Sequence, residues 1–401
     1  MANDLIIASA GSGKTTTLVE KAIEKANAGE TVLITTFTEA CEEEIKNKLI
    51  KKNNGYISDN ITIQTWFSFL IKHGAKPYQD CIIDTEITGL ILVSGKSGLR
   101  CETEDGKKIY WGEAKNPYEF YFSKSGKIYS DKLAKFVIRC NKDSGKKVIN
   151  RISQCFDNIF IDEVQDLAGY DLEILKELFN CQSNILLVGD PRQATYSTNN
   201  AQKNAKFKKS RIVNFFSEDT IKIDADDKLL TVNHRCSSQI CKYSNTLYPD
   251  LPESTSGNDT VTGHDGIIIV DKSHVDSYLE EYQPVQLRYS VTKQVNVDYP
   301  VYNFGKSKGL TFDRVLIYPT GPIFKWLISS ENELKGISRA GFYVALTRAR
   351  YSVGIVLEPK QYKEIKALGP GKAFTFFVPK KSPTSPGGNS RSLGQKFPKA
   401  K

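Results

Sequence analysis

The residues with the clearest chemistry lie near the start of this 401-residue chain, at positions 8–15, which read ASAGSGKT. A short apolar run, Leu5–Ile7, precedes them, and a segment typical of a helix, 16–28, follows. A strand, a glycine-rich loop and a helix in this order predict a phosphate-binding loop, in which backbone N–H groups turn toward phosphate oxygens. A tight turn before a helix is the plainer alternative. The residues expected to hold phosphate are Ala10, Gly11, Ser12, Gly13, Lys14, Thr15 and Thr16.

Two side chains of this loop have separate expected tasks. Lys14 is expected to reach the β- and γ-phosphates of a nucleotide, and the Thr15 hydroxyl to bind Mg²⁺. Ala8 stands where the usual pattern has its first glycine, so the strict motif is broken at one position.

An acidic pair follows an apolar segment in the middle of the chain. Residues 158–161 predict a strand, and Asp162 and Glu163 come directly after it. At a strand end Asp162 can hold Mg²⁺, while Glu163 can act as general base on an attacking water. An acidic cluster after a strand is usually a solvated loop, but a phosphate-binding loop earlier in the chain gives this pair a partner.

A glutamine and an arginine extend the set. The strand expected at 185–188 leads to Gln193, in the place of a γ-phosphate sensor. Near the C-terminus the segment 342–350 carries Arg348, which can neutralise charge on a transferring phosphoryl group. Four such elements in this order predict a site that hydrolyses a nucleoside triphosphate.

Taken together, these segments resemble superfamily 1 helicases of the UvrD/Rep type, and the resemblance covers residues 5–357. Its most specific parts are the DEVQD box at 162–166 and the VALTRA segment at 344–349. The resemblance implies an α/β fold with two RecA-like P-loop NTPase domains, each with a parallel sheet, plus an inserted 1B-like subdomain. Further matching segments lie at 8–15, 35–40, 63–68, 188–196, 232–235 and 308–310.

The resemblance also implies roles for individual residues. Arg235 and Arg348 of the second domain would reach the γ-phosphate when the cleft closes. His234, in the place of the family's tyrosine, would stack on adenine, and Lys308 and Gly309 would contact the nucleotide. The implied catalytic set is Lys14, Glu163, Gln193, Arg235 and Arg348.

The implied contacts to a nucleic-acid strand are Phe37, Thr65, Trp66 and Tyr196. Trp66 could instead be a core residue. Thr198 occupies the place of a family tryptophan that stacks on a base, so one stacking platform is expected to be lost. Thr311 stands where the UvrD branch has a ribose-contacting glutamate, which leaves the direction of translocation open.

The motif positions divide the chain. Residues 1–70 and 156–215 are expected to form the first RecA-like domain, with an inserted subdomain at 71–155. The second RecA-like domain is expected at 216–379, followed by a basic, disordered tail at 380–401. The insertion interleaves aromatic and basic residues, which suits either a strand-binding surface or the small core of the subdomain. The interval between Arg235 and Lys308 leaves no room for a substantial 2B subdomain.

Composition sets the wider limits. The net charge of +9 suits a phosphate-backbone partner, although ordinary solubilising charge is the alternative. No apolar run is long enough to span a bilayer, so no membrane partner is expected. The eight cysteines form no CxxC pair and read as reduced thiols, which predicts a cytoplasmic protein, bacterial or viral and acting inside a host cell.

The sequence therefore predicts an ATP-dependent DNA helicase or translocase that uses ATP and Mg²⁺ and moves along single-stranded DNA, with 3′–5′ as the favoured direction. RNA stays open as a substrate, as does a nuclease or a replication, repair or defence protein as partner. One alternative is a DNA-stimulated ATPase that remodels protein–DNA complexes with little unwinding. The other is a nonenzymatic nucleic-acid-binding module, against which the intact site residues argue.

Overall fold

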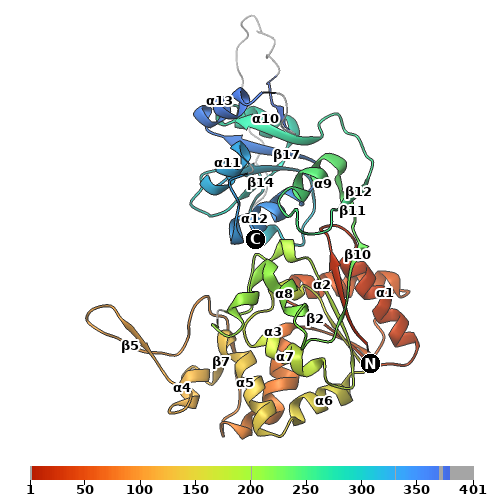
Figure 1. Cartoon of the computed structure of the whole chain (residues 1–401), viewed down its shortest axis with the longest axis vertical. Coiled ribbons are helices and arrows are strands. Elements are labelled where there is room, and N and C mark those ends of the chain that lie inside the picture. Colours follow the sequence, from red (N-terminus) through yellow and green to blue (C-terminus); the bar gives the residue numbers. More distant parts are fainter. Residues whose placement is uncertain (1, 200, 330, 370–373, 380–401) are drawn as a thin grey trace, which may run out of the picture.

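The computed structural model describes residues 2–199, 201–329, 331–369 and 374–379. Figure 1 shows two α/β domains stacked along the long axis, with an arm that leaves the side of the first. The predicted basic tail, 380–401, lies outside the described residues.

The first domain is built on a six-stranded sheet in which every paired strand is parallel. Its strands are short apolar runs, and the middle strands are almost wholly buried, as expected where helices cover both faces of a parallel sheet. The strand order is β10 (Asp224–Leu230), β1 (Asn3–Ala8), β9 (Asn184–Gly189), β8 (Asn158–Ile161), β2 (Val32–Thr36) and β3 (Ile61–Thr65).

Helices pack on the two faces of this sheet because successive strand residues point to opposite sides. Ile6 and Ile34 face α1 (Lys14–Asn27) and α2 (Glu39–Lys52), whereas Leu5 and Leu33 belong to the core on the other face. That second face is covered by α3 (Trp66–Phe69), α5 (Ser130–Asp143), α6 (Lys147–Cys155), α7 (Asp171–Leu178) and α8 (Val213–Phe216).

The second domain repeats this plan with another six-stranded sheet of parallel pairs. The strand order is β15 (Val301–Asn303), β14 (Val285–Arg288), β16 (Phe312–Tyr318), β17 (Ala349–Leu357), β13 (Gly266–Asp271) and β18 (Thr375–Phe376). One face carries α10 (Val275–Tyr282), and the other carries α9 (Ser238–Asn245), α11 (Gly321–Ile328), α12 (Gly336–Leu346) and α13 (Pro359–Ala367). A parallel pair, β11 (Val232–Ser237) and β12 (Thr255–Asn258), lies beside α9 and β17.

The predicted fold class is confirmed, since the chain forms two RecA-like α/β domains with parallel sheets. Two predicted boundaries are wrong. The first domain does not end at residue 215, because β10 pairs with β1 at the edge of the first sheet. The insertion does not extend to residue 155, because α5 and α6 pack in the core of the first domain.

The inserted part is a projecting arm, visible at the left of Figure 1. It contains β4 (Gly89–Ile91) paired with β7 (Lys127–Tyr129), the hairpin β5 (Leu99–Glu102) and β6 (Lys108–Tyr110), and α4 (Pro117–Tyr121). Phe122 is buried against Phe136, with ring centroids 5.4 Å apart, so this ring belongs to the core. Trp111, in contrast, lies on the arm with the Arg100 guanidinium 4.9 Å from its ring centroid.

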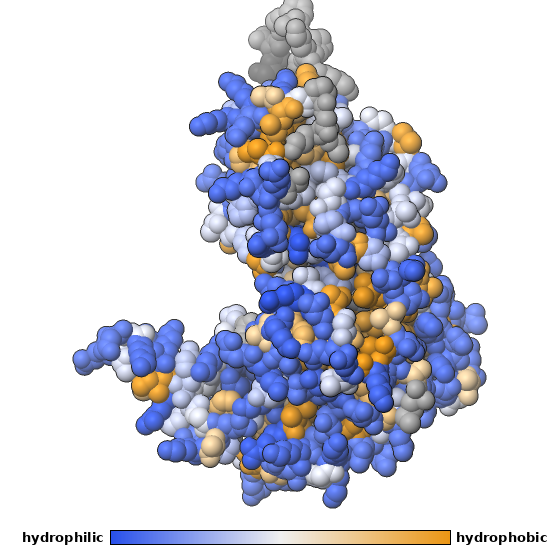
Figure 2. Space-filling model, in the orientation of Figure 1, coloured by the Kyte–Doolittle hydropathy of each residue, from blue (hydrophilic) through white to orange (hydrophobic). Residues whose placement is uncertain are grey.

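Figure 2 shows hydrophilic residues over most of one face of the molecule, which narrows between the two domains. No helix in the described ranges is long and apolar enough to cross a membrane. All eight cysteines are free thiols.

Candidate active site

A cleft of about 960 Å³ opens between the carboxyl ends of the first sheet and the second domain, within the range of roughly 300–1,000 Å³ typical of small-molecule sites. It is lined from both domains. The predicted residues that line it are Gly11, Gly13, Lys14, Thr15, Asp162, Glu163, Gln193, His234, Arg235, Gly309 and Arg348.

The phosphate-binding loop follows β1 directly, and its shape depends on glycine. Gly11 and Gly13 have φ angles of +69° and +91°, in the left-handed region that side chains avoid. Gly13 caps α1, which begins at Lys14, so the free N–H groups and the positive dipole end of that helix lie at the cleft. Lys14 Nζ donates to the Ser9 carbonyl at 3.3 Å.

The loop also touches the second domain. A Cβ atom on Gly11 would lie 2.4 Å from Asn233 Oδ1 and 2.9 Å from Arg235 Cβ, so no side chain fits there. The Gly11 carbonyl accepts a hydrogen bond from the His234 N–H at 3.0 Å. The loop and β11 therefore form the two walls of one site.

The acidic pair stands at the end of β8. Glu163 has a φ of +55°, an uncommon conformation for a residue with a side chain and one often found at functional sites. Burial and the neighbouring Glu163 charge raise the pKa of Asp162 to about 7. Burial would also raise the pKa of Glu163, but the Lys308 and Lys14 charges outweigh it and lower that pKa to about 2. A cation beside Asp162 would favour its ionised form.

Lys308 has a different place from the one expected. It does not line the cleft; its side chain is 8% exposed, and Nζ lies 2.6 Å from Asp166 Oδ2 and 3.3 Å from Glu163 Oε2. Lys308 therefore acts on the site through Glu163, across the domain junction, which corrects its predicted place among the nucleotide contacts.

Two arginines enter the cleft from the second domain. Arg348 is 2% exposed and donates to the carbonyls of Val344 and Leu310 and to Gln193 Oε1, at 3.2, 3.0 and 3.2 Å. Arg235 Nη1 donates to the Thr347 carbonyl at 3.0 Å. Among the described residues neither guanidinium forms an ion pair.

Burial, together with the nearby Arg235 charge, lowers the pKa of Arg348 to about 9, and burial also lowers the pKa of Arg235. Buried cations that lack a counter-charge destabilise the cleft until an anion enters it. The arrangement therefore fits an anionic ligand such as a triphosphate.

Gln193 connects the two halves of the site. Its Nε2 donates to Asp190 Oδ2 at 2.8 Å in the first domain, while its Oε1 accepts from Arg348 of the second. An amide at this point can sense whether the second domain has approached.

The sequence and the structure differ at the margins of the cleft. Ala10, Ser12 and Thr16 belong to the loop or the first turn of α1 but do not line the cleft. Residues in the lining that the predicted set lacks are Cys41, Glu44, Lys48, Thr311 and Arg350. The three from α2 follow the spacing i, i+3, i+7, which places them on one helix face and could have indicated them. Glu44 and Lys48 form an ion pair at 2.7 Å.

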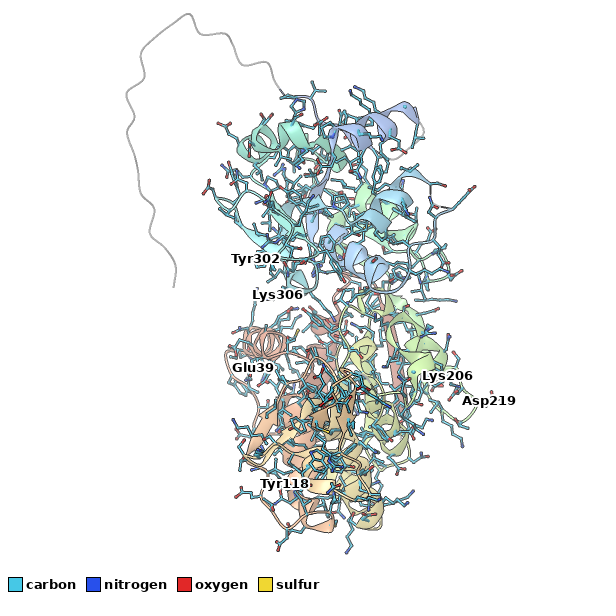
Figure 3. All side chains as sticks on the ribbon, turned by 90° about the vertical axis from the view of Figure 1, so that its left-hand side faces the viewer. Glu39, Tyr118, Lys206, Asp219, Tyr302 and Lys306 are labelled. Carbon is cyan, nitrogen blue, oxygen red and sulfur yellow. The ribbon has the colours of Figure 1, made fainter. Side chains whose placement is uncertain are left out.

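The predicted strand contacts fall into two groups. Phe37 and Tyr196 are half-buried, with ring centroids 5.9 Å apart, and Phe67 lies 6.0 Å from Phe37. Thr65 lies beside them and caps α3 by accepting from the Ser68 N–H at 3.2 Å. Figure 3 shows Glu39, just after this strand–helix turn, and Lys306 on the same side of the domain junction. These aromatics form an accessible surface suited to stacking.

Trp66 does not belong to that surface. It is 1% exposed, and its indole N–H donates to Asp171 Oδ1 at 2.7 Å. The strand contact predicted for Trp66 is therefore wrong, and its core alternative holds. Thr198, in the place of the family tryptophan, donates to the same carboxylate, as does Asn199.

The two domains and the cleft between them define a class: a P-loop protein with two RecA-like domains. Within that class the chain belongs to the UvrD/REP helicase family, because the model of the UvrD/REP helicase N-terminal domain matches residues 2–80 and 75–211.

Three curated relatives share parts of the chain. A probable DNA helicase II homolog of Mycoplasma capricolum is 28% identical over 60% of this chain and 38% of its own. The RecBCD enzyme subunit RecB of Borreliella burgdorferi is 31% identical over 27% and 9%. One subunit of an ATP-dependent helicase/nuclease of Pediococcus pentosaceus is 47% identical over 16% and 6%. The chain thus spans less than two fifths of the length of each.

The burial of Trp66 gives a stability prediction. Trp66→Phe keeps an aromatic ring but removes one donor to the buried Asp171 carboxylate, so we expect the free energy of unfolding to fall by about 1–3 kcal/mol. Urea unfolding measures this, with Trp111→Phe on the arm as the matched control. Unchanged stability together with weaker binding of single-stranded DNA would restore Trp66 as a strand contact.

Proposed function

We propose that this protein is an ATP-dependent DNA helicase or translocase, in which ATP hydrolysis between the two domains drives movement along single-stranded DNA. The observation that carries the proposal is the cleft that joins the loop around Lys14 and the acidic pair with Arg235 and Arg348 of the second domain.

The chain's own groups suit hydrolysis of a triphosphate. Lys14, Arg235 and Arg348 supply positive charge around the phosphates, and Gln193 links the sensor side to Arg348. Glu163 is ionised and can take a proton from the attacking water.

Thr15 and Asp162 would hold Mg²⁺. They are two oxygen donors in the same cleft, and Mg²⁺ commonly takes only one or two protein ligands beside phosphates and waters, so the residues fit the ion. Its chemistry would be to neutralise charge on the phosphate oxygens.

Coupling follows from the location of the cations. Arg235 and Arg348 move with the second domain, so binding of ATP draws the domains together and loss of the γ-phosphate releases them. Each cycle would shift a strand bound near Phe37 and Tyr196, where two rings lie close to the junction. His234, an exposed residue in the cleft lining, would stack on the adenine.

The partner that we propose is single-stranded DNA, read through its phosphates and bases rather than its sequence, with 3′–5′ movement and RNA as the competing substrate. The positive net charge supports a phosphate-backbone partner. The relatives named as RecB and as part of a helicase/nuclease support a nuclease or a replication, repair or defence protein as a second partner. We place the protein in the cytoplasm.

A second candidate is a DNA-stimulated ATPase that remodels protein–DNA complexes with little unwinding. Two observations favour it. Thr198 is buried where the family has a stacking aromatic, and no further domain stands between Arg235 and Lys308.

Displacement of streptavidin from biotinylated oligonucleotides separates these candidates and sets the direction. A 3′–5′ translocase is expected to remove streptavidin from the 5′ end of single-stranded DNA in the presence of ATP, and not from RNA. Removal from the 3′ end would reverse the direction. ATP hydrolysis without displacement from either end, and without unwinding of a tailed duplex, would favour the remodelling ATPase.

Arg348→Ala tests the role of the second domain. Because Arg348 would act on the γ-phosphate in the transition state, we expect turnover to fall on the order of 10³-fold while the Kd for ATP changes only a few-fold. Steady-state hydrolysis and nucleotide-binding fluorescence measure the two quantities, with Arg314→Ala as the control. An equal loss of binding and turnover would contradict this assignment.

A further inference from the structure

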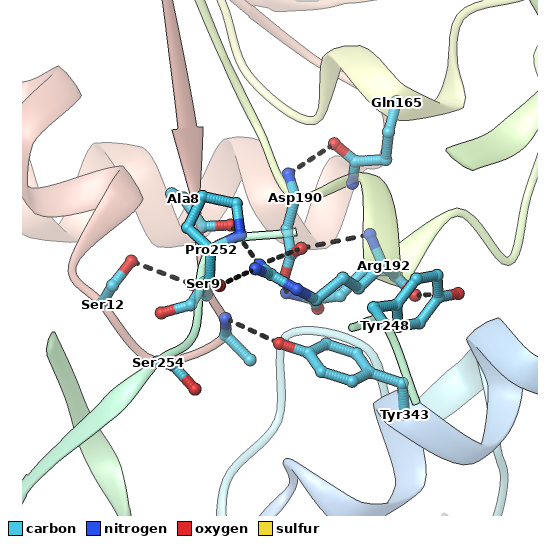
Figure 4. Close-up of polar contacts among 12 residues, drawn as sticks. Ala8, Ser9, Ser12, Gln165, Asp190, Arg192, Tyr248, Pro252, Ser254 and Tyr343 are labelled. Atoms are coloured by element: carbon cyan, nitrogen blue, oxygen red, sulfur yellow. Dashed lines mark hydrogen bonds and ion pairs between the residues drawn. The ribbon is translucent and has the colours of Figure 1, made fainter. Parts of the chain in front are cut away.

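A buried guanidinium outside the cleft joins the two domains (Figure 4). Arg192 is 3% exposed and lies in the 3₁₀ turn Pro191–Gln193, next to the proposed sensor Gln193. It does not line the cleft, and the proposed hydrolysis gives it no task.

On the first-domain side, Arg192 contacts the base of the phosphate-binding loop. Its Nη1 donates to the Ala8 carbonyl, where β1 ends, at 3.4 Å. The same nitrogen lies 3.3 Å from Asp190 Oδ1, at the end of β9. Arg192 thus ties together the two strands that carry the loop and the sensor.

On the second-domain side, three groups surround the same residue. Its Nη2 donates to the Pro252 carbonyl, and its own carbonyl accepts from the Tyr248 hydroxyl at 3.3 Å. The guanidinium carbon lies 5.9 Å from the centroid of the Tyr343 ring, within the range of a cation–π contact.

Tyr343 continues the connection into the active site. Its hydroxyl accepts a hydrogen bond from the Ala10 N–H of the loop at 3.4 Å, and it is 1% exposed. Its carbonyl accepts from Thr347 N and Oγ1 at 3.0 and 2.8 Å. The Thr347 carbonyl in turn accepts from Arg235, and Arg348 is the next residue in the chain.

We propose that Arg192 and Tyr343 are positioning residues that hold the phosphate-binding loop in register with Arg235 and Arg348. The inference rests on the proposed ATP hydrolysis and deepens it. α12 carries Tyr343 to the loop at one point and Arg348 to the cleft a little over one turn later, so a shift at Tyr343 moves Arg348. A misplacement of about 1 Å can cost on the order of 10²-fold in rate.

A purely structural role is the competing explanation, because any buried contact between domains contributes to stability. Stability alone is a weak reason for a buried Arg–Asp pair, since desolvation offsets much of its attraction. Tyr343→Phe separates the two explanations, because it keeps the ring and its packing and removes only the hydroxyl that accepts from Ala10.

The chain offers a matched control for this variant. Tyr243 is another buried tyrosine of the second domain, and its hydroxyl has no hydrogen-bond partner among the described residues. Tyr243→Phe therefore removes a buried hydroxyl from the same domain without touching the loop.

The experiment measures kcat, the Kd for a non-hydrolysable ATP analogue and the melting temperature for wild type and variants. We expect Tyr343→Phe to lower kcat on the order of 10-fold or more, with Kd within about threefold and the melting temperature within about 4 °C. Arg192→Met should lower kcat at least as far and Arg192→Lys should recover part of it, whereas Tyr243→Phe should match wild type. The double variant Arg192→Met/Tyr343→Phe should lose less than the product of the two single losses.

Hydrogen exchange gives a readout that does not need turnover. Tyr343→Phe should speed exchange in a peptide that covers Ala10, and Tyr243→Phe should not. Wild-type kcat together with unchanged exchange in Tyr343→Phe would overturn the inference, as would a loss of kcat that follows only the melting temperature. If wild type hydrolyses no ATP with any nucleic acid, the proposed function fails, and the exchange result alone decides the positioning role.

Discussion

The close approach of the phosphate-binding loop to β11 is the constraint on which the rest of the site depends. Gly11 has no room for a Cβ atom because Asn233 and Arg235 occupy that space. The two domains can therefore meet near the position of the phosphates, and residues far apart in the chain line a single cleft. Hydrolysis that needs both walls can report the distance between the domains, which is what a motor requires.

Much of this arrangement could be predicted because it is local in sequence. The loop after β1 and the acidic pair after β8 each follow an apolar strand, and parallel strands bring their carboxyl ends to one edge of a sheet. Gln193 follows β9 for the same reason. The family resemblance supplied Arg235 and Arg348, since nothing in their local sequence shows which site they face.

Other features depend on tertiary contacts that no local pattern reveals. Trp66 follows an exposed-looking strand end, yet the buried Asp171 carboxylate draws its indole into the core. Lys308 belongs to a nucleotide-contacting motif, but Asp166 and Glu163 of the other domain take up its charge. β10 is rich in aspartate and reads as a loop, and its pairing with β1 makes it the edge strand of the first sheet.

The measurement that tests the central claim most directly is ATP hydrolysis by the purified protein, alone and with single-stranded DNA, beside Glu163→Gln. The account predicts slow hydrolysis without DNA, strong stimulation by single-stranded DNA, and loss of both in Glu163→Gln with ATP binding retained. Hydrolysis that DNA does not change, or that persists in Glu163→Gln, would contradict it.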